Sequence, residues 1–307
     1  MAHSTHHKRD FLRLTDISRE ELLELVERAA AWKLLGKDGP RPLERMTLGL
    51  VFEKASTRTR VSFEVAAYQL GGNAMMLSPR DTQLGRGEPI KDTARVLSRY
   101  LDALVVRTFE HAKLEEMAAR ATVPVVNALT DASHPCQVLA DLLTITERFG
   151  AEALRRPGLE VAWIGDGNNM ANAWLEACCV LGFALRLACP SGYDADPELL
   201  ARAGARARLV RSPAEAARGA QVVNTDVWAS MGQEAEAAER QRHFAGFIVD
   251  RALMSGADPK AIVLHCLPAH RGEEIAEDVL EGPQSAIFDQ AENRLHAQKA
   301  LLEMLLS

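Results

Sequence analysis

The chain has 307 residues and a net charge of −6, and 47% of its residues are hydrophobic and 25% charged. These values fit about two ordinary globular domains, since one domain usually takes about 100–200 residues. The chain has no long run of Lys or Arg and no apolar stretch near the ~20 residues that cross a bilayer, so it predicts neither nucleic-acid binding nor a membrane span.

The start of the chain and its cysteines bear on where the protein works. Residues 1–10 are polar and rich in histidine, without the apolar core of a signal peptide. The five cysteines include no C-x-x-C pair and no zinc-ligand spacing. We therefore expect a cytoplasmic protein with reduced thiols and no metal site.

The first half of the chain alternates predicted strands and helices. Apolar side chains recur at helical spacing over residues 18–33, and Ser18 is a suitable N-cap for that helix. The strands of this half are predicted at residues 47–52, 74–77, 103–107 and 124–127. The remaining helices are predicted at residues 61–70, 91–100, 113–121 and 137–149. Residues 79–89, which are rich in Gly, Pro and polar side chains, are predicted to form a mobile loop.

The same alternation restarts after residues 149–158, which we predict to be a domain boundary. Strands are predicted at residues 159–164, 184–188, 207–210, 222–224, 247–248 and 262–265, and helices at 170–181, 197–203, 213–218 and 292–306. This order favours an α/β fold of two domains, each a parallel sheet covered by helices. Ligands in such folds bind beyond the carboxyl ends of the strands, where the polar segments of this chain lie.

The first polar segment is Ser56-Thr57-Arg58-Thr59-Arg60, between a predicted strand and the start of a helix. Free backbone N–H groups and the positive end of the helix dipole favour an anion at such a place. Guanidinium groups pair with phosphate oxygens in a bidentate manner, so the segment suits a dianionic phosphate. A capped helix start with solvated arginines is the alternative interpretation.

The second polar segment, His134-Pro135-Cys136-Gln137, also lies between a strand and a helix. The imidazole can donate to a carbonyl oxygen, and the carboxamide can accept from an amide N–H of the same group. Taken alone, the motif is weak evidence, because a single histidine in a loop is usually structural.

The third segment, Gly165-Asp166-Gly167-Asn168-Asn169, follows a strand and opens a helix. It resembles the start of a dinucleotide fingerprint, but the third glycine and the later acidic residue are missing. Asn168 and Asn169 therefore suit a polar substrate better than NAD.

Two later segments also follow strands. Asp226 can pair with an α-ammonium group while Ser230 and backbone amides meet an α-carboxylate, although Asp226 is also a suitable helix N-cap. His265 stands beside Cys266, an arrangement that suggests a thiol nucleophile. Because buried cysteines are commonly inert, hydrolase chemistry is the weaker interpretation.

Together and in order, these segments resemble the ornithine carbamoyltransferases over nearly the whole chain. Residues 56–60, 91–95 and 134–137 are similar to the family's carbamoyl phosphate signature, and the wider transcarbamylase superfamily shares the first and last of them. Residues 226–232 and 265–268 are similar to the segments that separate ornithine from aspartate as the acceptor.

The resemblance implies transfer of the carbamoyl group of carbamoyl phosphate to the δ-amine of L-ornithine, which gives L-citrulline and phosphate in arginine biosynthesis or breakdown. The residues it implies for carbamoyl phosphate are Ser56, Thr57, Arg58, Thr59, Gln83, Arg107, His134, Gln137, Cys266, Leu267 and Arg294. Those it implies for ornithine are Asn168 or Asn169, Asp226, Ser230 and Met231. The catalytic residues among them are Arg58, Arg107, His134 and Cys266.

The resemblance also implies how the molecule is organised. A carbamoyl-phosphate-binding domain would comprise residues 1–149, completed by the C-terminal helix 292–307, and an ornithine-binding domain residues 150–291, with the active site in the cleft between them. Similar enzymes are homotrimers or multiples of trimers, in which Gln83 would reach carbamoyl phosphate in a neighbouring subunit. No cofactor or metal is implied.

Three alternative functions remain. A related transcarbamylase would use N-acetylornithine, putrescine or aspartate, but the Ser230-Met231-Gly232 segment favours a free α-amino acid. A binding module without activity would keep the fold, but Arg58 and His134 argue against it. A nicotinamide oxidoreductase is testable by titration with the cofactor.

Overall fold

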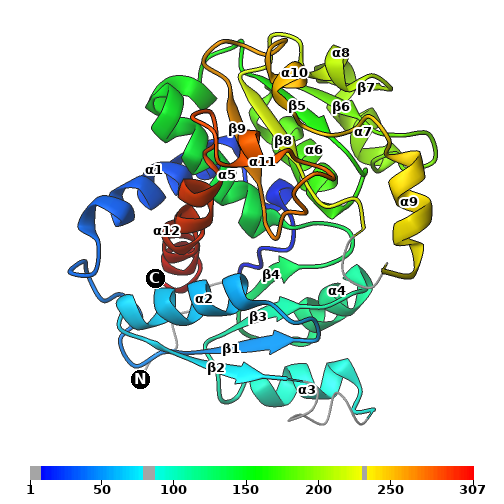
Figure 1. Cartoon of the computed structure of the whole chain (residues 1–307). Helices are drawn as coiled ribbons and strands as arrows, with labels where there is room; N and C mark the ends of the chain where they lie inside the picture. The colour runs from blue at the N-terminus through cyan, green and yellow to red at the C-terminus, as the bar shows by residue number, and fades with distance from the viewer. Residues whose placement is uncertain (1–7, 79–86, 230–233) are drawn as a thin grey trace. The chain divides into compact units, whose positions relative to one another are not determined.

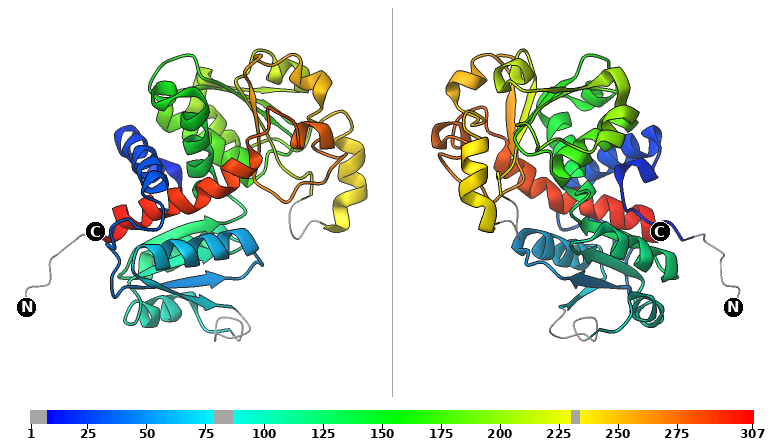
Figure 2. Two further views of the ribbon diagram at one scale, coloured as in Figure 1. Left: turned by 60° about the vertical axis from the view of Figure 1, so that its left-hand side comes forward. Right: turned by 90° about the vertical axis from the view of Figure 1, so that its right-hand side faces the viewer.

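The computed structural model describes residues 8–78, 87–229 and 234–307 (Figures 1 and 2). The chain forms two compact units, Met1–Cys136 with Arg294–Ser307, and Gln137–Asn293. Each unit contains one parallel sheet covered by helices, so the predicted fold class is confirmed. Within these ranges, every helix is too short or too polar to cross a bilayer.

The first unit is built on a four-stranded sheet in the order β2-β1-β3-β4. Its strands are β1 (Thr47–Phe52), β2 (Asn73–Leu77), β3 (Ala103–Arg107) and β4 (Val125–Leu129). The chain moves outward from β1 to β2 and then returns to β3 on the other side. Because crossovers between parallel strands are right-handed, this reversal puts the helix after β1 on one face and the next two helices on the other. Figure 1 shows this arrangement.

The helices of the first unit are α1 (Arg19–Leu35), α2 (Thr57–Gln69), α3 (Ile90–Leu97) and α4 (His111–Arg120). An apolar cluster joins Leu104 and Val106 of β3 to Leu114 and Met117 of α4. Since successive side chains of a strand point to opposite faces, Arg107 at the end of β3 lies on the other face, which α2 covers.

The second unit is built on a five-stranded sheet in the order β7-β6-β5-β8-β9. Its strands are β5 (Glu160–Ile164), β6 (Ala184–Ala188), β7 (Ala207–Val210), β8 (Val222–Thr225) and β9 (Ile262–His265). Here the chain moves outward from β5 to β7 and then returns to β8, which lies beside β5. The strand order therefore reverses between β5 and β8, as it does between β1 and β3 in the first unit.

The helices of the second unit are shorter and more varied. They are α6 (Asn169–Leu181), α7 (Pro197–Ala203), α8 (Pro213–Ala217), α9 (Ala237–His243), α10 (Arg251–Met254) and α11 (Glu277–Leu280). Two longer helices, α5 (Pro135–Phe149) and α12 (Ile287–Leu306), carry the chain from one unit into the other. Short 3-10 helices are η1 (Leu14–Asp16), η3 (Ala151–Leu154), η4 (Gly204–Arg206) and η5 (Glu234–Glu236).

Most predicted elements are confirmed, and the exceptions have physical reasons. Helix α2 begins before the predicted residue 61, because Ser56 caps it by accepting a hydrogen bond from Thr59 N at 3.2 Å. The predicted strand at residues 247–248 is wrong, because Phe247 packs into the apolar core without joining the ladder. The short helices α9, α10 and α11 were not predicted.

The compact units divide the chain earlier than the predicted domain boundary at residues 149–158. Helix α5 groups with the second unit almost entirely, through hydrogen bonds to the start of α12. Asn293 Nδ2 donates to Thr144 Oγ1 at 3.0 Å, and Gln290 Nε2 donates to Asp141 Oδ1 at 2.6 Å. The periodicity of α5 predicts the helix but does not show which sheet it packs with.

Close packing beside the turn after β5 leads to a test of stability. A Cβ on Gly167 would lie 2.1 Å from the backbone nitrogen of Ala195, whereas one on Gly256 would meet only Leu253 O at 3.5 Å. Gly167→Ala should therefore lower the free energy of unfolding by about 1–3 kcal/mol, the usual effect of overpacking. Gly256→Ala is the matched control, and denaturant unfolding of both variants measures the difference. Equal stabilities would contradict the close approach at Gly167.

Candidate functional site

The candidate site residues form two groups, each near the place where the strand order of a sheet reverses. Between β1 and β3, and again between β5 and β8, the helices that follow the strands leave on opposite faces. Such a reversal opens a crevice beyond the carboxyl ends of the two strands, which is where α/β proteins bind ligands. We call the group in the first unit the donor half-site and the group in the second unit the acceptor half-site.

The donor half-site begins at the N-terminus of α2. Ser56 is the N-cap, and Thr57 and Arg58 stand exposed in the first turn, while Thr59 is buried. The first-turn N–H groups of a helix have no partner within the helix and carry its partial positive charge. Lys54, also buried, pairs with Asp131 and lies 4.1 Å from the centre of the Phe109 ring, which fixes the segment leading into the cap.

Two buried arginines complete this half-site. Arg107 ends β3 and is level with Phe52 at the end of β1, so it stands beside the segment that leads to α2. Arg294 comes from α12, and its Nη2 donates to Thr59 Oγ1 at 2.8 Å. Two guanidiniums are thus held in the interior near the start of α2.

His134 lies among these cations. Its side chain is buried, and its Nδ1 has no hydrogen-bond partner in the described chain. Burial, followed by the charges of Arg294, Arg107 and Arg58, holds the pKa of His134 well below 6.5. The imidazole is therefore neutral, and the three guanidiniums that act on it leave an excess of positive charge suited to a dianion.

Gln137 lies in the second compact unit, where its Nε2 donates to Asp141 Oδ1 at 2.9 Å. Three other residues that the sequence assigned to substrate binding, Gln83, Ser230 and Met231, lie outside the described residues. Their assigned roles stay predictions.

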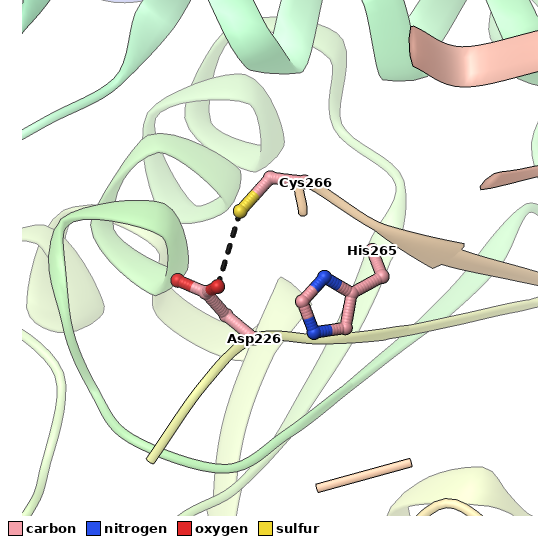
Figure 3. A group of neighbouring side chains, drawn as sticks. All are labelled: Asp226, His265 and Cys266. Carbon is pink, nitrogen blue, oxygen red and sulfur yellow. Dashed lines mark hydrogen bonds between the residues drawn. The ribbon is translucent and has the colours of Figure 1, made fainter. Parts of the chain in front are cut away.

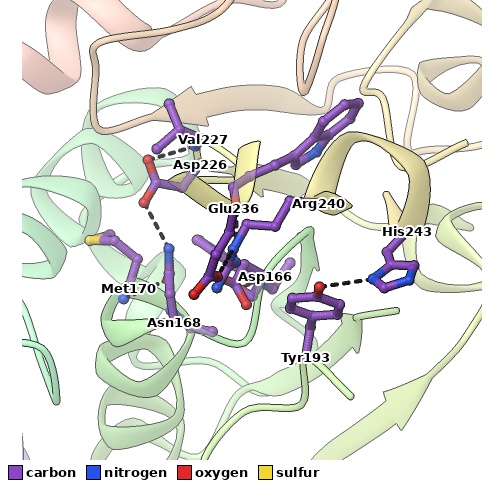
Figure 4. Close-up of polar contacts among 12 residues, drawn as sticks. Asp166, Asn168, Met170, Tyr193, Asp226, Val227, Glu236, Arg240 and His243 are labelled. Carbon is purple, nitrogen blue, oxygen red and sulfur yellow. Dashed lines mark hydrogen bonds and ion pairs between the residues drawn. The ribbon is translucent and has the colours of Figure 1, made fainter. Parts of the chain in front are cut away.

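The acceptor half-site is centred on Asp226, which directly follows β8. Parallel register places Thr225 of β8 level with both Ile164 of β5 and His265 of β9, so the three following turns lie at one edge of the sheet. The carboxylate of Asp226 is buried and accepts hydrogen bonds from neighbouring groups on each side. These come from Val227 N at 2.9 Å, Cys266 Sγ at 3.1 Å and Asn168 Nδ2 at 3.0 Å (Figures 3 and 4).

Asn168 is engaged through both ends of its carboxamide. Its oxygen caps α6 by accepting from Met170 N at 2.9 Å, and its amide nitrogen donates to Asp226. Asn169 is the first residue of α6. This arrangement makes Asn168 a support for Asp226, and contact of Asn169 with ornithine stays a prediction.

The geometry around His265 argues against hydrolase chemistry and a metal site. Ligand atoms of Asp226, His265 and Cys266 lie within 4.8 Å of one another (Figure 3). However, His265 Nδ1 accepts from Leu267 N at 2.9 Å, and Nε2 lies 3.0 Å from Glu274 Oε1. Both ring nitrogens are therefore engaged, and the thiol of Cys266 donates to Asp226 rather than to an imidazole base.

The turn after β5 also argues against a dinucleotide site. The backbone of Asp194 and Ala195 fills the space beside Gly167. Glycine at this position therefore allows the two backbone segments to pack closely and does not make room for a pyrophosphate. Asp166 pairs with Arg240 of α9 at 2.8 Å, a buried contact that the sequence analysis missed because α9 shows no apolar periodicity.

Comparisons with known proteins place both halves of the chain in one family. The carbamoyl-P binding domain of aspartate/ornithine carbamoyltransferase matches residues 9–147, and the Asp/Orn binding domain matches residues 157–305. An anabolic ornithine carbamoyltransferase of Pseudomonas aeruginosa is 56% identical over 97% of each chain. An ornithine carbamoyltransferase of Halorhodospira halophila is 55% identical over 97% of this chain and 99% of its own.

Solved structures agree with these matches. The ornithine carbamoyltransferase from Pyrococcus furiosus has a TM-score of 0.92 and 48% identity over 97% of each chain. The anabolic enzyme from Campylobacter jejuni has a TM-score of 0.91 and 44% identity, over 97% of this chain and 98% of its own.

The donor half-site predicts that His134 stays neutral in the unliganded protein. In the unfolded chain the imidazole regains its ordinary pKa, so the unfolded state takes up the extra proton as the pH falls below 6.5. His134 therefore makes the fold less stable on acidification. Ring NMR of the unliganded protein, with the signal assigned by its loss in His134→Gln, should show no titration midpoint at or above 6.5. A midpoint there would contradict the cationic surroundings.

Proposed function

Because the chain belongs to the aspartate/ornithine carbamoyltransferase family, we infer that it transfers the carbamoyl group of carbamoyl phosphate to the δ-amine of L-ornithine, giving L-citrulline and phosphate. The observation that carries this function is the set of three guanidiniums acting on a neutral, buried His134. The donor substrate brings a dianionic phosphate to balance that charge, and its carbonyl gives the imidazole an acceptor.

The donor half-site would divide its work between the two ends of carbamoyl phosphate. Ser56, Thr57, Arg58 and the first-turn N–H groups of α2 suit the phosphate, as at other helix N-termini that bind anions. Arg107, together with the neutral His134, suits the carbonyl oxygen, where negative charge grows during attack. A neutral imidazole can donate there without adding another cation. Removing one such donor typically lowers kcat by about 10²–10³-fold.

The acceptor half-site would bind the α-groups of ornithine, with Asp226 pairing with the α-ammonium. In solution the δ-amine has a pKa near that of lysine, about 10.4, and as an ammonium it cannot attack. Loss of water favours its neutral form, because burial disfavours the charged ammonium. The amine nitrogen then bonds to the carbamoyl carbon, the bond from that carbon to the phosphate oxygen breaks, and the nitrogen releases a proton.

Several finer assignments are part of the same proposal. The anabolic names of the Pseudomonas and Campylobacter relatives support a role in arginine biosynthesis. A cytoplasmic location and a homotrimer, or a multiple of trimers, are proposed from the family resemblance. Gln83 of a neighbouring subunit would then contact carbamoyl phosphate, and the domains would bind carbamoyl phosphate and ornithine in that chain order.

A substrate panel tests the reaction itself. Purified protein with carbamoyl phosphate and L-ornithine should form citrulline and phosphate in equal amounts, without added metal or cofactor. N-acetylornithine, putrescine and aspartate, tested in place of ornithine, should give far slower release of phosphate. If any of these three amines reacted faster than ornithine, that amine would be the acceptor instead. If no amine were carbamoylated, the proposed activity would be refuted.

Substitutions in the two half-sites should raise the KM of different substrates. Arg58→Ala should raise the KM for carbamoyl phosphate by about 30-fold or more, because breaking a charged pair costs roughly 2–5 kcal/mol. Asp226→Asn should raise the KM for ornithine instead. Arg60→Ala is a matched control, since exposed Arg60 pairs with Glu64 one turn along α2. If Arg58→Ala affected only ornithine, or Asp226→Asn only carbamoyl phosphate, the half-sites would be assigned the wrong way round.

A further inference from the structure

Arg240 of α9 is a buried arginine whose contacts lie beside the acceptor half-site (Figure 4). Its Nη1 donates to Asp166 Oδ2 at 2.8 Å and to the backbone oxygen of Trp228 at 2.9 Å. Its Nε donates to Glu236 Oε2 at 3.0 Å, and its guanidinium carbon lies 5.0 Å from the centre of the Tyr193 ring. The side chain is thus held by two carboxylates, a carbonyl and an aromatic face.

The residues that Arg240 contacts lie close in sequence to Asn168 and Asp226 of the acceptor half-site. Asp166 lies two positions before Asn168 in the turn after β5, and Trp228 lies two positions after Asp226 in the turn after β8. Asn168 and Asp226 are hydrogen-bonded to each other. The same two turns are therefore tied twice, once by this direct bond and once through Arg240, across the point where the strand order reverses.

The charge of Arg240 matters because Asp166 is buried. Burial raises the pKa of Asp166 to about 6 even though Arg240 opposes the shift. Arginine stays protonated in proteins, so it remains a partner for the ionised carboxylate. Without it, Asp166 would be a buried acid lacking its cation and Trp228 O would lose its donor, and groups left unsatisfied in this way drive a local rearrangement.

We propose that Arg240 is a positioning residue for the amino-acid substrate. It holds the turns after β5 and β8 together so that Asp226 meets the α-ammonium of the substrate, while its Nε and Nη1 donate to groups of the protein. The proposal rests on the proposed function of the acceptor half-site. Since its contacts lie within the second unit, its loss should weaken ornithine binding and leave carbamoyl phosphate binding alone.

The test compares Arg240→Met with a matched surface variant, Arg211→Met. Exposed Arg211 likewise joins a carboxylate to a backbone carbonyl, through Asp194 Oδ2 at 3.0 Å and Cys189 O at 3.0 Å. The measurements are KM for each substrate and Ki for L-norvaline, which has the α-groups and carbon chain of ornithine without the δ-amine. Arg240→Met should raise the ornithine KM and the norvaline Ki by about 5–30-fold. Arg211→Met should change neither.

A pH profile separates positioning from general support. As the pH falls through about 6, Asp166 takes up a proton and its pair with Arg240 weakens. The other charged or titratable groups that act on Asp166 are Glu236, Asp226 and the thiol of Cys189. The norvaline Ki of the wild-type chain should therefore rise on acidification in that range, whereas Asp166→Asn should flatten the profile. Norvaline lacks the δ-amine, so titration of that group does not enter.

The outcomes separate the two proposals. An active wild-type enzyme in which folded Arg240→Met keeps its ornithine KM and norvaline Ki would overturn the positioning role. So would equal rises in KM for both substrates, which indicate general disruption. If Arg240→Met does not fold, Arg240→Lys and the profile of Asp166→Asn decide, and a profile like that of the wild type overturns the role. A wild-type chain that forms no citrulline would refute the proposed function instead.

Discussion

Parallel pairing with a reversal of strand order is the constraint on which both half-sites depend. Because all the paired strands of each sheet are parallel, their carboxyl ends share one edge, and the reversal leaves that edge uncovered between two neighbouring strands. In the first unit the gap is between β1 and β3, next to the start of α2 and Arg107. In the second it is between β5 and β8, where Asn168 and Asp226 meet. The chain thus uses the same topological arrangement twice, once in each unit.

The two half-sites handle charge in opposite ways. The donor half-site gathers guanidiniums from β3, α2 and α12 and keeps its histidine neutral, so a dianion is the group that best satisfies it. The acceptor half-site surrounds a single carboxylate, Asp226, with hydrogen-bond donors that hold it in place.

The sequence predicts the elements whose signals are local and misses those set by distant contacts. The strands 103–107 and 262–265 were predicted to the residue, because short apolar runs between turn residues define them. Arg58 and Asp226 are predicted as site residues because polar residues at strand ends stand out against apolar strands. The buried contact of Arg240 with Asp166 was not predictable, because α9 shows no apolar periodicity and Asp166 lies 74 residues away along the chain. The grouping of α5 with the second unit depends likewise on residues near 290.

The capping contact of Asn168 has a consequence for chemical ageing. Aspartate caps helices about as well as asparagine, so hydrolysis of this one amide would leave α6 intact. It would also replace the donor facing Asp226 with a second carboxylate, and the two negative charges would repel each other. A preparation damaged in this way would keep the cap of α6 but lose the hydrogen bond that holds Asp226 in position.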